Sequence, residues 1–144
     1  VQGRLRGYSR ALRAAGIEPD ERLRVDAAPS ERDGRAAVEQ LIGSGAGFDA
    51  IFAASDVAAI GAIHALQHAG RTVPEIAVVG FDDIPAASLA SPALTTVTQD
   101  ARRAAEALID TLIQSIETGR AEGQVLPVRL MVRESSIALA PAGV

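Results

Sequence analysis

Apolar residues along this 144-residue chain recur with two different spacings, and the two spacings alternate. Near the start, Leu5, Tyr8 and Leu12 lie three and four residues apart, which predicts a helix that ends at Gly16. Farther on, short runs that are apolar almost throughout are separated by helix-like stretches. Such runs are typical of parallel strands that are covered on both faces. The pattern therefore predicts an α/β fold with a parallel, doubly wound sheet.

The predicted elements follow one another regularly along the chain. We expect strands at residues 22–27, 48–55, 73–81 and after Pro127, a short strand or connector at 93–100, and helices from about residue 31, from 56 to about 69 with Asp56 as N-cap, and from 101 to 118. The last helix carries an apolar stripe made of Ala105, Leu108, Ile109, Leu112, Ile113 and Ile116. The final residues, 137–144, are expected to form a poorly ordered tail.

Composition and charge narrow the classes of function. The net charge is −4, so the chain lacks the excess of positive charge that is typical of nucleic-acid-binding domains. All 14 basic residues are arginine, which removes Schiff-base lysines and the lysine of phosphate loops from consideration. There is no cysteine, so disulfides and thiolate metal sites are excluded. No apolar run approaches the roughly 20 residues that span a bilayer, and no membrane partner is expected.

Two motifs resemble known sites but lack the rest of the pattern. His64 and His68 have the spacing of a zinc-binding pair, but Ala65 stands where a metalloprotease places glutamate and no third ligand is evident. A solvated helix face explains them better. The glycine-rich residues 43–47 follow a helix and precede a strand, which is the reverse of the order in phosphate-binding loops. We therefore expect no metal and no cofactor.

Polar residues follow two of the predicted strands at the point where each strand ends. They are Ser55 and Asp56 after one strand, and Asp82 and Asp83 after the next. Ligands of doubly wound sheets bind at this edge. A carboxylate accepts hydroxyl hydrogen bonds worth about 1.5–3 kcal/mol each, and a guanidinium such as that of Arg4 supplies complementary donors. Three interpretations stay open: a ligand site, a metal-dependent hydrolase that uses the three aspartates, and helix caps or turns.

Four stretches, taken in order, resemble a known family. "RLRGYSRALRAAGI", "FDAIFAASDVAAIGAIHALQHAGRTVPEIAVVGFDDIP", "SPALTTVTQD" and "LPVRLMVRES" are similar to the effector-binding domain of LacI/GalR-type bacterial transcriptional regulators. The resemblance runs from about Gly3 to Ser136. It implies a periplasmic-binding-protein-like (type I) fold with two α/β subdomains, a ligand cleft between them, and a helix-turn-helix headpiece upstream that binds operator DNA.

The resemblance also implies how the chain is organised. Residues 1–136 would be an effector-binding core, mainly the C-terminal subdomain, and the helix at 101–118 would pack against an N-terminal subdomain that this sequence lacks. The chain, which begins without Met, is therefore expected to be a fragment of a longer protein.

The family's ligand contacts carry over to Arg4, Ser55, Asp56 and Asp82, whereas Asp83 is expected to tether the following loop. Pro29 stands where many relatives place an aromatic residue against the ligand, so the effector is narrowed only to a sugar- or nucleoside-like molecule.

The same resemblance places a homodimer face on the helix after Asp56 and the loop after Asp83, with Ile60, Ile63 and Ala90 in it. Packing of Ile60 and Ile63 on the sheet alone is the other possibility. The function implied is that of a cytoplasmic sensor domain, not an enzyme, that reaches DNA only through the headpiece. The alternative is a periplasmic sugar-binding protein of an ABC transporter.

Overall fold

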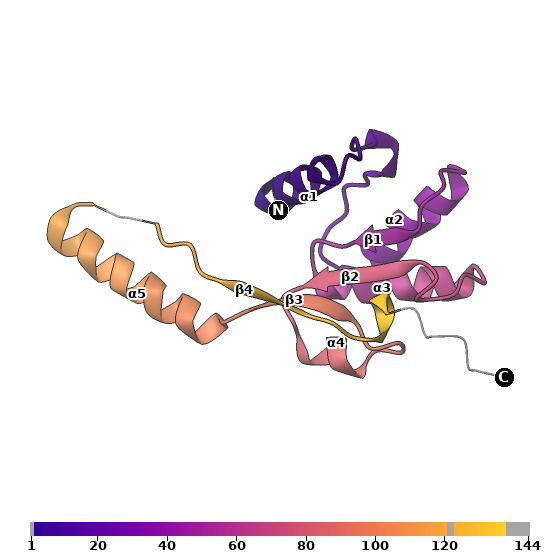
Figure 1. Cartoon of the computed structure of the whole chain (residues 1–144). Helices are drawn as coiled ribbons and strands as arrows, with labels where there is room; N and C mark the ends of the chain where they lie inside the picture. The colour runs from indigo at the N-terminus through magenta and orange to yellow at the C-terminus, as the bar shows by residue number, and fades with distance from the viewer. Residues whose placement is uncertain (1, 121–122, 138–144) are drawn as a thin grey trace.

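The computed structural model describes residues 2–120 and 123–137, which fold into a sheet with helices beside it (Figure 1). The elements in chain order are α1 (Gln2–Ala14), a 3₁₀ turn (Glu21–Leu23), α2 (Glu31–Gly43), β1 (Ala50–Phe52), α3 (Asp56–His68), β2 (Ala77–Phe81), α4 (Pro85–Leu89), β3 (Thr95–Gln99), α5 (Ala101–Thr118), β4 (Val128–Met131) and a second 3₁₀ turn (Glu134–Ser136). The predicted tail, 137–144, lies outside the described residues except for Ile137.

The sheet has four strands in the order β1-β2-β3-β4. The first three are parallel, as the apolar runs predicted, with Ile51 opposite Val78 and Gly80 opposite Thr96. The last strand differs because it runs antiparallel to β3 and places Leu130 opposite Val97. The sheet is therefore mixed, with an antiparallel edge strand of the kind that α/β proteins often carry.

The core lies between the sheet and the helices α2 and α3. Its buried apolar side chains come from α2, α3, β2 and the region around α4: Val38, Ala59, Ala62, Ile63, Ala65, Leu66, Val78, Ala87 and Leu94. Two glycines allow α2 and α3 to approach closely. A Cβ on Gly34 would lie 2.2 Å from the Ala58 carbonyl oxygen, and one on Gly61 would lie 2.0 Å from the Glu31 carbonyl oxygen. No larger residue fits at either position unless the helices separate.

The predicted strand at residues 22–27 is wrong. The segment instead begins with the 3₁₀ turn because Asp20 accepts hydrogen bonds from the backbone N–H and the side chain of Arg22. The hydrogen bond from the Arg22 side chain also lowers the pKa of the Asp20 carboxyl group. Beyond the turn the backbone at Arg24 is extended, but no strand pairs with it among the described residues. Within residues 22–27 only Leu23 and Val25 are half-buried, and the charged side chains are exposed.

Helix α5 has the bounds that its sequence predicted and ends at Gly119, whose φ is +69°. Figure 1 shows it (orange) extending away from the sheet from the end of β3. None of its residues is buried, and the apolar stripe is open to solvent, with Leu108 70% and Ile116 77% exposed. Packing of this stripe against a further subdomain stays a prediction. Within the described ranges, no helix is long and apolar enough to cross a membrane.

Candidate functional site at the carboxyl edge of the sheet

Neighbouring strands deliver polar side chains to one edge of the sheet. Asp82 directly follows β2, and Gln99 is the last residue of the adjacent strand β3. The Gln99 side-chain amide donates to Asp82 Oδ1 over 3.2 Å. Ser55 follows β1 on the other side of β2 and starts α3. The general rule for parallel sheets thus places these residues correctly, although sequence reasoning missed Gln99.

Arg4 reaches this edge from α1. Its Nη2 lies 3.5 Å from Asp82 Oδ1 and its Nη1 donates to the Ala54 carbonyl oxygen over 2.5 Å. The guanidinium also lies over the Phe81 ring, 3.8 Å from the ring centroid, where the aromatic face attracts a cation. Both charged side chains are partly exposed. Arg4 and Asp82 thus come together across 78 residues of chain, and their role in binding a ligand stays a prediction.

A cavity of about 440 Å³ opens beside this pair, between α1, the 19–29 segment, α2 and β1. Arg4, Ser55 and Asp82 belong to its wall. The rest of the wall is largely apolar and includes Leu5, Tyr8, Pro29, Val38, Leu41, Phe48 and Phe52. The rings of Tyr8 and Phe52 are stacked, with centroids 6.2 Å apart. A large apolar wall with a few convergent polar groups is the usual make-up of a small-molecule site.

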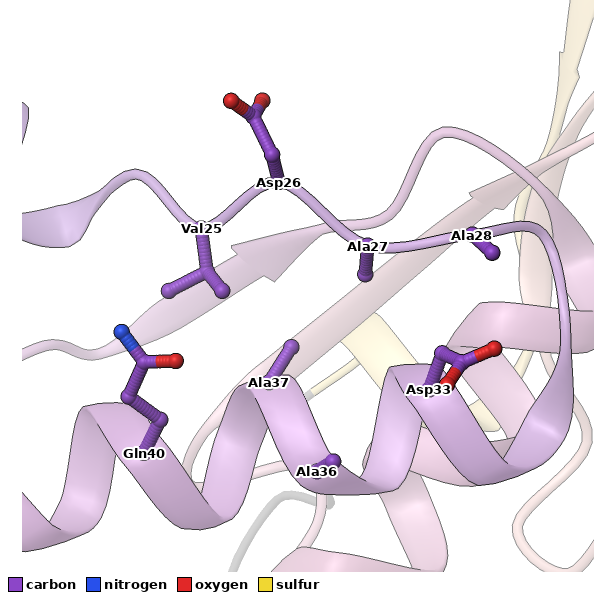
Figure 2. Close-up of a pocket in the computed structure, with 8 residues that line it drawn as sticks. All are labelled: Val25, Asp26, Ala27, Ala28, Asp33, Ala36, Ala37 and Gln40. Carbon is purple, nitrogen blue, oxygen red and sulfur yellow. The ribbon is translucent and has the colours of Figure 1, made fainter.

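A smaller hollow of about 220 Å³ lies against the outer side of α2. Figure 2 shows that Val25 and Ala27 point toward the helix whereas Asp26 points away from it. On the helix, the wall consists of Asp33, Ala36, Ala37 and Gln40. This hollow brings no charged pair together, so the larger cavity is the better candidate.

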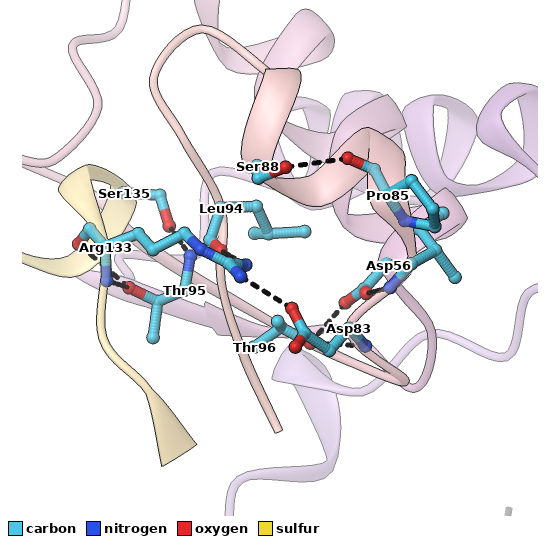
Figure 3. A network of polar contacts seen from close by, with 10 residues as sticks. Asp56, Asp83, Pro85, Ser88, Leu94, Thr95, Thr96, Arg133 and Ser135 are labelled. Atoms are coloured by element: carbon cyan, nitrogen blue, oxygen red, sulfur yellow. Dashed lines mark hydrogen bonds and ion pairs between the residues drawn. The ribbon is translucent and has the colours of Figure 1, made fainter. Parts of the chain in front are cut away.

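Asp56 occupies a different position from the one predicted. Ser55, not Asp56, is the N-cap of α3, because Ser55 Oγ accepts the Ala58 N–H over 3.3 Å. Asp56 is 0% exposed, accepting the Thr96 hydroxyl at Oδ1 (2.5 Å) and the Ile84 N–H at Oδ2 (2.9 Å), as Figure 3 illustrates. The prediction that Asp56 is a cap is wrong, and its carboxylate offers no surface to a ligand in this structure.

Asp83 is held by Arg133, which lies 50 residues away in the chain (Figure 3). Arg133 Nη2 donates to Asp83 Oδ1 over 2.7 Å, and Nη1 donates to the Leu94 carbonyl oxygen over 2.9 Å. Asp82 and Asp83 have φ values of +113° and +55°, a region that non-glycine residues rarely adopt. The two adjacent aspartates therefore differ: one faces the cavity and the other is tied to the end of the sheet.

Residues after β4 form hydrogen bonds with β2 and β3. Ser135 donates from Oγ to the Val78 carbonyl oxygen over 2.6 Å and accepts the Thr95 N–H over 2.8 Å. Glu134 accepts the Ala93 N–H at Oε2. Sequence reasoning missed this arrangement; its only signal was the change from an alternating strand to the polar run after Val132.

Similarity to known proteins shows the family to which this chain belongs. The family model described as periplasmic binding protein-like domain matches residues 2–136. The HTH-type transcriptional regulator CelR of Thermobifida fusca is 41% identical over 92% of this chain and 40% of CelR. The HTH-type transcriptional repressor PurR of Edwardsiella ictaluri is 33% identical over 96% of this chain and 41% of PurR. The chain belongs to the periplasmic-binding-protein-like domain family of LacI-type regulators.

Solved structures of LacI-type proteins share the fold. A transcriptional regulator CelR–cellobiose complex superposes with a TM-score of 0.85 at 40% identity, over 92% of this chain and 42% of that one. A Lac repressor dimer bound to operator and the anti-inducer ONPF gives 0.82 at 31% identity, over 94% of this chain and 47% of that one. The chain spans about 40% of the length of the curated relatives it matches.

The residues predicted for a LacI-type dimer face do not all lie on the surface. Ile63, in α3, is 1% exposed and belongs to the core, which favours the alternative that it packs on the sheet over a place in a dimer face. Ile60 and Ala90 are half-buried. Leu89, by contrast, is 83% exposed.

The three aspartates of the alternative hydrolase interpretation point to separate partners in this LacI-type chain. Asp56 is bound by Thr96, Asp83 by Arg133, and Asp82 lies beside Arg4. Among residues 2–120 and 123–137, no group of three or more acidic or histidine side chains is placed to hold a metal ion. His64 Nδ1 lies 2.9 Å from Glu31 Oε1 on the exposed side of α2 and α3. The geometry therefore favours a ligand pocket over a hydrolytic metal centre.

Proposed function

We propose that this chain is the effector-binding part of a LacI-type transcriptional regulator, and that Arg4 and Asp82 bind the effector. The observation that carries the proposal is their ion pair at the wall of the 440 Å³ cavity. Membership of the LacI-type family supports it, and the relatives named above are regulators, not enzymes.

The pair is suited to hydroxyl-bearing ligands. In the part of the chain that the structure describes, both contacts of the Asp82 carboxylate go to Oδ1, from Arg4 and from Gln99. Oδ2 can therefore accept hydroxyl groups of a ligand, each bond being worth about 1.5–3 kcal/mol because the acceptor is charged. Arg4 is fixed over Phe81 and can donate from its remaining N–H groups. Ser55 adds a hydroxyl close to the α3 N-terminus.

We infer a sugar- or nucleoside-like effector. The apolar wall can pack against the face of a sugar or base, while the charged pair fixes its hydroxyl groups. The CelR relative was solved with cellobiose, which makes a disaccharide the first compound to try. Asp56 has no part in this set, because it supports the Ile84 backbone behind Asp82 and does not line the cavity.

Regulation would follow from a difference in affinity between two conformations. An effector that bridges this chain and a second subdomain binds the closed arrangement better than the open one, and only that difference shifts the equilibrium. We propose that the complete protein is a cytoplasmic homodimer, and that it contacts operator DNA through a headpiece outside these residues. The net charge of −4 is consistent with a sensor that does not itself bind DNA.

A thermal-shift screen on the complete protein tests the proposal. Cellobiose, other disaccharides, monosaccharides, nucleosides and purines are compared at equal concentration, and binding to the native state raises the melting temperature. At least one compound is expected to stabilise the wild type. Asp82→Ala should abolish that shift while operator binding stays intact, and Asp110→Ala, a change on the exposed side of α5, is the matched control. Loss of operator binding in Asp82→Ala alone would count against the assignment.

A further inference from the structure

The turn that carries Asp82 is backbone-strained and needs support from outside. Asp82 and Asp83 both have positive φ, at +113° and +55°. Non-glycine residues in such regions are strained and persist only where the surroundings hold them. Part of the support comes from within the sheet, since the Asp82 N–H donates to the Val97 carbonyl oxygen over 2.9 Å.

The strongest contact on the turn is the ion pair between Asp83 and Arg133. The two charged groups meet at 2.7 Å, and each side chain is only 21% exposed. By comparison, Arg4 and Asp82 lie 3.5 Å apart and are more exposed. Close, partly buried ion pairs hold their geometry better than solvated ones, because water screens them less.

Arg133 is itself fixed at both ends. Its backbone N–H donates to Thr95 Oγ1 over 2.8 Å, and its carbonyl oxygen accepts the Thr95 hydroxyl over 2.9 Å. Its second guanidinium nitrogen is bound to the Leu94 carbonyl oxygen. A planar guanidinium held by two bonds acts as a rigid fork, which a lysine ammonium cannot reproduce. Arg133 can therefore fix the position of Asp83 relative to the sheet.

We propose that Arg133 is a positioning residue for effector binding: it holds Asp83, and thereby keeps the preceding Asp82 aimed at Arg4 and the cavity. The inference rests on the proposed function, because it assigns a role to a residue that does not line the cavity. It predicts that effector affinity depends on a side chain on the far side of the turn.

The test compares three single variants and one double variant of the complete protein. Arg133→Met removes both guanidinium bonds, Arg133→Lys keeps the charge but not the fork, and Leu66→Ala is a control that lowers stability from the core, at a residue that lines neither the cavity nor the turn. Amide hydrogen exchange, read by NMR, reports the turn without any ligand. Isothermal titration with cellobiose reports binding.

Arg133→Met is expected to raise the exchange rates of the Asp83 and Ile84 amides at least tenfold, while those of Val78 and Val79 stay within twofold of the wild type. Its Kd for cellobiose should rise at least tenfold, with Arg133→Lys in between. Leu66→Ala should leave the Kd within twofold, because Leu66 does not line the cavity. Adding Asp83→Asn to Arg133→Met should change the Kd little further, because both changes break one pair.

Two results would overturn the inference. One is unchanged exchange at Asp83 and Ile84 in Arg133→Met, or a rise spread evenly over β2 as in Leu66→Ala. The other is faster exchange confined to the turn with an unchanged Kd. If no compound in the thermal-shift screen stabilises the wild type, the proposed function fails, and the exchange measurement still decides whether Arg133 holds the turn.

Discussion

Replacing Asp56 by alanine tests whether this carboxylate is an internal support or a ligand contact. Its side chain is fully buried and accepts two hydrogen bonds, from the Thr96 hydroxyl and the Ile84 N–H. Each hydrogen bond to a charged acceptor is worth about 1.5–3 kcal/mol, and the alanine leaves both donors without a partner. We therefore expect Asp56→Ala to lower the free energy of unfolding by about 3–5 kcal/mol. Asp56→Asn should lower the free energy of unfolding by only about 1–2 kcal/mol. The amide oxygen can still accept the Ile84 N–H, and the amide N–H can donate to the Thr96 hydroxyl oxygen.

Urea unfolding followed by far-UV circular dichroism measures the change, with the slope of the transition checked for constancy. Asp110→Ala, at an exposed position on α5, should stay within about 0.5 kcal/mol of the wild type. If Asp56→Ala changes stability by less than about 1 kcal/mol while it abolishes effector binding, the reasoning is refuted. Asp56 would then contact the ligand, as the family resemblance implied.

The close contact of α2 and α3 and the open face of α5 give two further predictions. Gly61→Ala should lower stability by about 1–3 kcal/mol in urea unfolding, because its Cβ would overlap the Glu31 carbonyl oxygen; Gly43→Ala, at an open helical position, should be neutral or slightly stabilising. Leu112→Glu together with Ile116→Glu should lower the weight-average mass of these 144 residues in sedimentation equilibrium, because the exposed stripe promotes self-association.

Each of these two predictions has an outcome that would contradict it. A Gly61→Ala protein as stable as the wild type would show that the two helices can separate without cost. Equal masses for the wild type and the double glutamate variant would show that the α5 stripe does not mediate association, and a monodisperse wild-type monomer would do the same.

Helices and parallel strands were predictable because their signals are local. The helix predicted from residue 56 to about 69 is α3, although its cap is Ser55 and not Asp56, and the helix predicted at 101–118 is α5, which ends before Gly119. The strand predicted at residues 22–27 is wrong because no strand among the described residues pairs with it, and a local pattern does not show whether a partner exists.

The site was predictable only in part. The rule for parallel sheets placed Asp82 at the correct edge, and the resemblance added Arg4. The partner of Asp83 could not be foreseen, because Arg133 lies 50 residues away and nothing in its spacing marks it. Burial of Ile63 was one of two possibilities, since α3 is apolar on most of its surface and the sequence does not single out the face that packs on the sheet.

Binding of an effector by Asp82 is the central claim, and calorimetry tests it most directly. The compound from the thermal-shift screen that raises the wild-type melting temperature most is titrated into wild type, Asp82→Asn and Asp110→Asn. Loss of the charged acceptor should raise the Kd at least tenfold in Asp82→Asn, in keeping with about 1.5–3 kcal/mol per bond, and leave Asp110→Asn unchanged. An Asp82→Asn protein that binds the compound as tightly as the wild type would contradict the account.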